Sequence, residues 1–168
     1  MKMSDLSHPL VSKRTDKNIV ATHHLISLVK RKSLREDLTK CVGIPTDRLA
    51  EYVAAYLTKS MVMDADGYDL IKPCGHKIEV KLAFINSNVY SGYAREEAKI
   101  GNLKTKTSDL LLFIIDGDKT PENPNYLRLF SMPFNVWKAK WKNDKGSMSF
   151  GSIRRKWYNN YQVEVNQL

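Results

Sequence analysis

The chain has 168 residues, 42% hydrophobic and 27% charged, which suits one globular domain and excludes disordered and fibrous classes. Its 27 Lys and Arg against 18 Asp and Glu give a formal net charge of +9, which predicts a polyanionic partner. No apolar run approaches the roughly 20 residues that span a bilayer, so we expect no membrane partner. The polar N-terminus lacks the apolar segment of a secretory signal, which predicts a cytoplasmic location. Cys41 and Cys74 lack zinc-site spacing, so free thiols are expected.

Three helices are predicted in the N-terminal part. Residues 16–31 combine spaced apolar side chains with a cationic end, which is typical of a helix C-terminus. Ser33 and Glu36 match the capping box, which predicts a second short helix ending near residues 43–45. The clearest helix covers residues 47–59, with Thr46 and Asp47 as its cap and apolar side chains repeating at three and four residues.

The pattern then changes to short β-prone runs. Strands are predicted at 68–72, 77–85, 110–116 and 126–131, with a fifth candidate at 161–165. Residues 110–115 are apolar without alternation, which indicates a central strand covered on both faces. Two further helices are expected, at 93–100 before Gly101 and from Pro133 through Trp141.

Together these elements predict an α/β fold with a central mixed sheet of four or five strands and helices on both faces. We expect a single domain. Its parts are an N-terminal helical part (1–45), a catalytic core (46–131) and a C-terminal helix followed by a basic and aromatic segment (132–168).

The most informative segment is 67–81, where two strand-like runs flank a turn that contains Pro73 and Gly75. Alternation along the second run places Glu79 and Lys81 on one face and apolar neighbours on the other. If the turn spans residues 72–76, Asp69 stands directly opposite Glu79, with Cβ atoms about 4.5–5.5 Å apart.

Two carboxylates so close repel each other unless a positive charge lies between them. A hard divalent cation, ligated by carboxylate oxygens, removes that conflict. Lys81 then adds a positive charge that can stabilise the negative charge developing on a phosphate. Because neighbouring carboxylates favour the ammonium form, electrostatic stabilisation suits Lys81 better than proton abstraction.

Asp69 followed by Glu79-Val80-Lys81 resembles the PD-(D/E)xK signature of restriction endonucleases and related nucleases, and the resemblance covers about residues 47 to 116. Tyr68 departs from it by replacing the proline. The resemblance implies Mg²⁺, with Mn²⁺ as a substitute, held by Asp69, Glu79 and the main-chain carbonyl of Val80. It also implies a helical glutamate near the metal, a position that Glu51 matches among small residues. A type II restriction endonuclease of prokaryotic or phage origin, cutting double-stranded DNA as a homodimer, is the function that it implies.

Several polar and basic residues outside the hairpin are candidates for DNA contact. A polar loop follows the second strand, basic residues precede the central strand, and two arginines lie near the C-terminus; ordinary turns and solvated loops would also explain these patterns. The candidates are Asn86, Ser87, Asn88, Tyr90, Ser91, Tyr93, Arg95, Lys104, Lys106, Arg154 and Arg155.

Three other interpretations remain open. Asp69, Glu79 and Lys81 could form a surface hairpin with cross-strand ion pairs. The Glu-x-Lys triplet alone does not decide against this hairpin, because the chain has a second one at Glu97 and Lys99. That copy falls in a predicted helix, where the two side chains do not share a face. A junction resolvase, nickase or transposition nuclease of the same fold would read DNA shape, and a non-catalytic DNA-binding module would need only the basic charge.

Overall fold

The structure is a computed structural model that describes residues 16–40, 46–65, 67–85, 99–100, 107–117, 119–140, 148–149 and 157–168. Its helices are α1 (Asp16–Ser27), α2 (Lys32–Lys40), α3 (Thr46–Thr58) and α4 (Phe134–Lys140), with 3-10 helices η3 (Trp157–Tyr161) and η4 (Val165–Gln167). Its strands are β1 (Met61–Ala65), β2 (Tyr68–Ile71), β3 (Lys77–Ile85), β4 (Lys99–Ile100), β5 (Asp109–Asp116), β6 (Leu127–Met132) and β7 (Met148–Ser149). This confirms a mixed α/β architecture.

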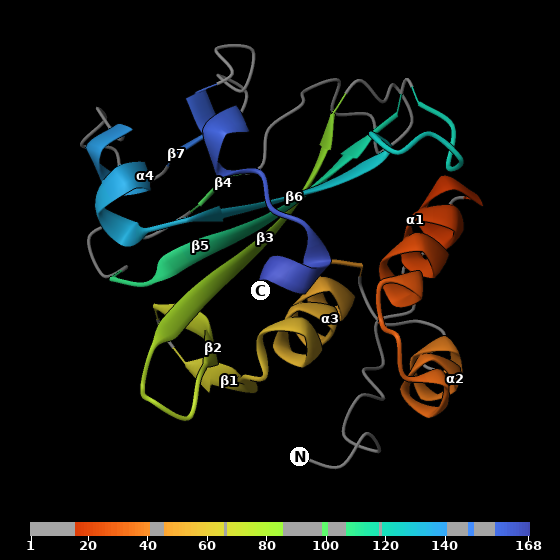
Figure 1. Ribbon diagram of the computed structural model, residues 1–168, viewed down its shortest axis with the longest axis horizontal. Coiled ribbons are helices and arrows are strands. Elements are labelled where there is room, and N and C mark those ends of the chain that lie inside the picture. The colour runs from red at the N-terminus through yellow and green to blue at the C-terminus, as the bar shows by residue number, and fades with distance from the viewer. Residues whose placement is uncertain are drawn as a thin grey trace.

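A five-stranded mixed sheet in the order β1-β2-β3-β5-β6 forms the centre of the molecule (Figure 1). Strands β1, β2 and β3 pair antiparallel, β3 pairs parallel with β5, and β6 returns antiparallel beside β5. The parallel register runs from Ile78 opposite Asp109 to Ile85 opposite Asp116. Strands β4 and β7 pair separately as a short two-stranded sheet.

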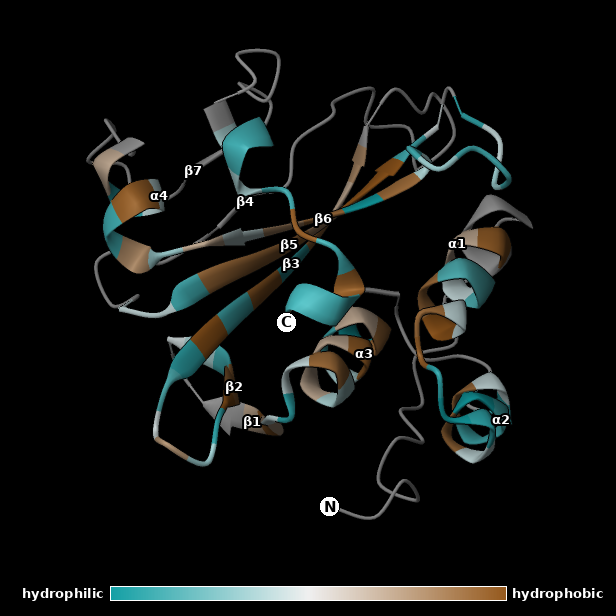
Figure 2. Cartoon of the chain, viewed as in Figure 1, coloured by the Kyte–Doolittle hydropathy of each residue, from teal (hydrophilic) through white to brown (hydrophobic). Residues whose placement is uncertain are grey.

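Strand β5 is buried on both faces, as its unbroken apolar sequence predicts. Its odd-numbered residues Leu111 and Phe113 belong to a core shared with α1, α2 and α3, whereas Leu110, Leu112 and Ile114 pack with Trp137 of α4 and Tyr158 of η3. Helices therefore cover both faces of the sheet. Figure 2 shows the apolar colouring concentrated along the central strands.

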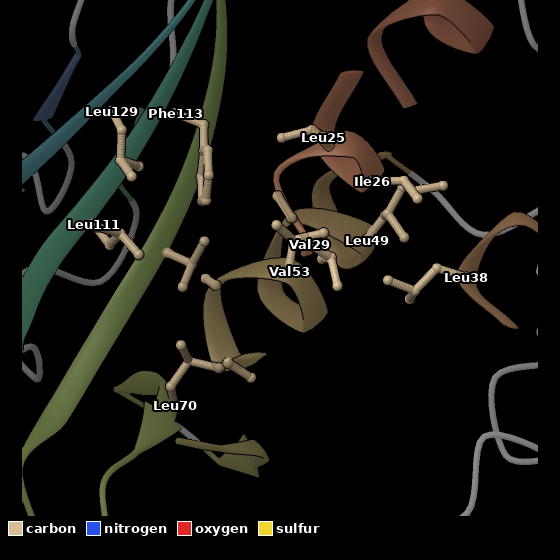
Figure 3. Close-up of a cluster of buried hydrophobic side chains, with 14 of the residues drawn as sticks. Leu25, Ile26, Val29, Leu38, Leu49, Val53, Leu70, Leu111, Phe113 and Leu129 are labelled. Carbon is tan, nitrogen blue, oxygen red and sulfur yellow. The ribbon is translucent and has the colours of Figure 1, made fainter. Parts of the chain in front are cut away.

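Helix α3 lies directly against the sheet because its small residues allow close approach. Ala50 and Ala54 are buried in the core with Val80 of β3. Its larger apolar residues Leu49 and Val53 share this core with Leu25 of α1 and Leu38 of α2, and α3 lies between those helices and the sheet (Figure 3). Because α3 buries apolar side chains on two sides, and burial of apolar surface stabilises a fold, the helix is held in place beside the strands.

The C-terminal segment passes around the β6 edge of the sheet. Tyr158 packs on the α4 face, Gln162 makes a β-bridge with Phe130, and Val163 and Val165 pack on the α3 face. The backbone N–H of Val163 donates to the carbonyl of Leu129 at 2.9 Å. This segment was predicted as a strand at 161–165, which is wrong: it forms two 3-10 turns joined by one bridge, because only that bridge and one backbone bond follow β6.

Most predicted elements are confirmed, with ends that differ by a residue or two, but two predictions for the N-terminal helices are wrong. Helix α1 ends at Ser27, four residues before the predicted end, where the N–H groups of Leu28 and Val29 bond three residues back and close the last turn. Helix α2 starts at Lys32, so Ser33 lies inside it. The Ser33 hydroxyl accepts from the Arg31 guanidinium at 3.1 Å and Glu36 faces Lys32 at 3.9 Å, which leaves no capping box.

Other differences concern short strands. Strand β1 was not predicted, because Met61–Ala65 carries a polar Asp64 among apolar residues and follows directly on α3. Lys99 and Ile100 form a strand, so the helix predicted at 93–100 is wrong at its end, and residues 93–98 lie outside the described part. The predicted end of the second helix, Cys41 and Trp141 also lie outside it.

Cys74 is an exposed free thiol, and no helix in the described ranges has the length and apolarity to cross a bilayer.

Candidate functional site

The β2–β3 hairpin carries the residues singled out for chemistry. Its turn closes through two backbone hydrogen bonds, from the N–H of Lys72 to the carbonyl of His76 and from that of Gly75 to the carbonyl of Lys72, both 2.8 Å long. Gly75 has a φ of +85°, a conformation that only glycine adopts at little cost. Ile71 pairs with Lys77, as the turn length predicted, and Leu70 pairs with Ile78. The backbone pairing ends there, so the predicted cross-strand pair of Asp69 with Glu79 is not part of the ladder, and the Asp69 carboxylate instead contacts the backbone of Val80.

Asp69 joins the two strands where their backbone pairing ends. Its Oδ2 atom accepts a hydrogen bond from the backbone N–H of Val80 at 2.7 Å. A side-chain carboxylate therefore takes the place of a strand carbonyl, and this contact holds Asp69 beside the Glu79-Val80-Lys81 triplet. Because Val80 is 4% exposed, the contact also satisfies a buried donor.

Glu79 and Lys81 form an ion pair on the α4 face of the sheet. They lie level with Leu110 and Leu112 of β5, which face α4, whereas Ile78 and Val80 face α3. The alternation predicted for this strand is therefore confirmed. The Nζ atom of Lys81 is 2.8 Å from Oε1 of Glu79, and the Glu79 side chain is completely buried while that of Lys81 is 28% exposed. The carboxylate is thus inside the protein, and only its cationic partner reaches the surface.

Three carboxylates act on Lys81 together. Burial lowers the pKa of Lys81, but the negative charges of Glu79, Asp69 and Glu51 outweigh it, so that the pKa lies above 10.5, its ordinary value. Lys81 is therefore a cation at neutral pH. A lysine that removes a proton from water needs a lowered pKa, so these charges oppose such a reaction at Lys81.

Glu51 lies on α3 and not on the hairpin, and its negative charge contributes to the raised pKa of Lys81. The helix position predicted for it is confirmed, and its side chain is 16% exposed. One turn earlier, the guanidinium of Arg48 forms an ion pair with the Oε2 atom of Glu51. The Arg48 guanidinium also lies 5.7 Å from the centre of the Tyr52 ring. Sequence reasoning missed Arg48, whose signal was its spacing of three residues from Glu51.

The donor chemistry suits a hard cation, since carboxylate oxygens and a main-chain carbonyl are the ligands that Mg²⁺ accepts. The side chains are not gathered as ligands: within the residues that can be described, no three His, Cys, Asp or Glu side chains converge as a metal-binding group. Instead, Asp69 contacts a backbone N–H, Glu79 contacts Lys81 and Glu51 contacts Arg48. Each of these carboxylates therefore already has a partner within the protein, and a metal ion would have to compete with that partner for the carboxylate oxygens.

A second polar link fixes the hairpin turn to β5 and α4. The Nε2 atom of His76 lies 2.9 Å from Oδ2 of Asp109, and Oδ1 of Asp109 accepts from the backbone N–H of Phe134 at 2.8 Å. Asp109 thus connects the turn to the first residue of α4. The His76 side chain is 46% exposed, and this contact gives it a structural role at the turn.

The predicted DNA contacts cannot be placed on this site. Residues 86–95, Lys104, Lys106, Arg154 and Arg155 lie outside the described part of the chain. In comparisons with known proteins, no family model matches the chain and no curated protein matches it.

Proposed function

We propose that the protein is a Mg²⁺-dependent endonuclease that hydrolyses DNA phosphodiester bonds, with a restriction-endonuclease-like fold. One observation carries the proposal: the carboxylate of Asp69 bonds the backbone N–H of Val80 at 2.7 Å, and the next residue, Lys81, pairs at 2.8 Å with the completely buried Glu79. A surface hairpin with incidental ion pairs would not bury a glutamate completely. Burial of a carboxylate costs stability, and such costs concentrate at functional sites.

Each residue has a distinct role in this proposal. Asp69, Glu79 and the Val80 carbonyl would hold the Mg²⁺ ion, with Glu51 contacting it directly or through water. When bound, the ion would activate a water molecule and stabilise charge on the phosphate. Lys81 remains protonated and supplies a fixed positive charge beside the reacting phosphate. Support from α3 and β5 keeps these groups on rigid elements, as efficient catalysis requires.

Double-stranded DNA is the proposed substrate because the chain carries a net charge of +9. Sequence-specific cleavage of the type II restriction kind is the proposed activity. One centre cuts one strand, so cutting both strands would require a homodimer. A structure-selective resolvase or nickase of the same fold would use the same hairpin, and substrate preference separates the two.

The test is incubation of the purified protein with unmethylated plasmid and phage DNA, in Mg²⁺, Mn²⁺ or EDTA. Asp69→Asn and Lys81→Met remove one charge each from the centre. Asp37→Asn and Lys40→Met are matched controls, because that pair, 3.7 Å apart, lies on α2 with both side chains exposed. Discrete fragments that need the metal, persist in both controls and vanish in both site variants are the expected result.

Other outcomes redirect the proposal. Nicking, or cutting confined to four-way junctions, would assign the site to a structure-selective nuclease. DNA binding that is indifferent to Mg²⁺, without cleavage of any substrate, would leave a non-catalytic DNA-binding module and overturn the catalytic interpretation.

A further inference from the structure

Arg48 stands out among the charged residues near the hairpin because it pairs with a carboxylate of the centre without belonging to the nuclease signature. Its guanidinium contacts Oε2 of Glu51 within α3, at a spacing of three residues. The Arg48 side chain is 34% exposed, whereas that of Glu51 is 16% exposed. The arginine is therefore the more exposed partner of the pair, and its guanidinium also lies 5.7 Å from the centre of the Tyr52 ring.

The charges of the centre are nearly balanced within the protein. Glu51, Asp69 and Glu79 supply three negative charges, against which Lys81 and Arg48 supply two positive ones. Arginine stays protonated at every pH that a folded protein meets, so Arg48 cannot make room for a metal by losing its proton. A divalent cation that uses Glu51 must therefore compete with the guanidinium for the same carboxylate.

We propose that Arg48 is a displaceable counter-ion of Glu51, which lowers the affinity of the centre for divalent metal and leaves Glu51 when the metal binds. This inference rests on the proposed nuclease function. Arg48 is a positioning residue here, because it acts through Glu51 and not on the reacting atoms. Lys81 differs from it, since its partner Glu79 is completely buried and its own charge is needed beside the phosphate.

Isothermal titration calorimetry with Mn²⁺ and with Mg²⁺, in the absence of DNA, measures this directly. Arg48→Met removes the charge while keeping a side chain of high helix propensity. We expect it to tighten metal binding about three- to fivefold, the scale of a partly exposed ion pair. Arg48→Lys should restore most of the wild-type affinity. Lys40→Met, which breaks the exposed pair with Asp37 on α2, should leave the affinity unchanged.

The same titration with Glu51→Gln is the second part of the test. This variant lacks the carboxylate for which the guanidinium and the metal compete. The tightening caused by Arg48→Met should then disappear in the double variant. Thermal unfolding with and without metal shows whether each variant is folded.

The outcomes separate the two proposals. If the wild-type protein binds metal and Arg48→Met binds it equally or more weakly, the counter-ion role is wrong and the nuclease proposal stands. If neither protein binds metal while both are folded, the proposed metal centre and the proposed role of Arg48 are both wrong.

Discussion

Oδ2 of Asp69 accepts a hydrogen bond from the backbone N–H of Val80 at 2.7 Å, just beyond the paired part of the β2–β3 hairpin. The same carboxylate contributes to the raised pKa of Lys81, one residue further along β3. Asp69 therefore has a structural contact and an electrostatic one. The two can be separated by substitution.

Asp69→Ala should destabilise the protein by about 1–3 kcal/mol, because the buried N–H of Val80 loses its acceptor. Asp69→Asn keeps an acceptor oxygen and should cost clearly less, while removing the charge that the proposed chemistry needs. Urea unfolding of both variants measures the difference. Equal destabilisation by Ala and Asn would show that the hydrogen bond with Val80 contributes little.

Lys81→Met should be costly because it leaves the carboxylate of Glu79 buried without its ion-pair partner. We expect a loss of roughly 3 kcal/mol, the lower end for a broken buried pair, since the lysine itself is partly exposed. The additional change Glu79→Gln removes the buried charge and should recover much of that loss. A double-mutant cycle in urea tests this, and an equal cost of Lys81→Met with and without the Glu79→Gln change would contradict it.

The charge of Lys81 should persist through the neutral and mildly alkaline range. Its folded pKa is raised above 10.5, so the stability that its charge contributes is fully present below pH 10.5 and is lost as pH rises through the folded pKa. Carbon NMR of the lysine side chains should show Lys81 titrating above pH 10.5, with the midpoint lower in Glu79→Gln. A midpoint near neutral pH would instead support proton abstraction by Lys81.

His24 of α1 should make the protein less stable in mild acid. Burial lowers its pKa below 6.5, and the nearby charge of Glu122 only partly opposes this. Because the unfolded chain binds this proton more tightly, the unfolding free energy should rise with pH from the lowered folded pKa up to 6.5. His24→Phe keeps a ring for the edge-to-face contact with Tyr126, at 5.0 Å between centroids. Urea unfolding from pH 5 to 8 should show a smaller slope in this variant, and an equal slope would exclude His24 as its source.

The local features of the site were predictable because they depend on spacing alone. A five-residue turn sets which residues of a hairpin pair, and the strand period of two then places Glu79 and Lys81 on one face. The unbroken apolar run of β5 predicted a strand covered on both sides, and the apolar repeat of α3 predicted its helix within a residue. Each of these follows from the chemistry of neighbouring residues.

Contacts between distant residues required the tertiary structure. Whether Glu79 is exposed depends on what α4 and the strands beside it cover, and the completely buried carboxylate paired with Lys81 could not be read from alternation. The bond from Val80 to Asp69 forms because β2 stops pairing with β3 at Leu70, and Asp109 meets His76 because β5 lies parallel to β3. The C-terminal segment forms 3-10 turns because it crosses the β6 edge instead of following it. Spacing along the chain decides which face a side chain takes, but burial and charge pairing depend on which elements the fold packs against that face.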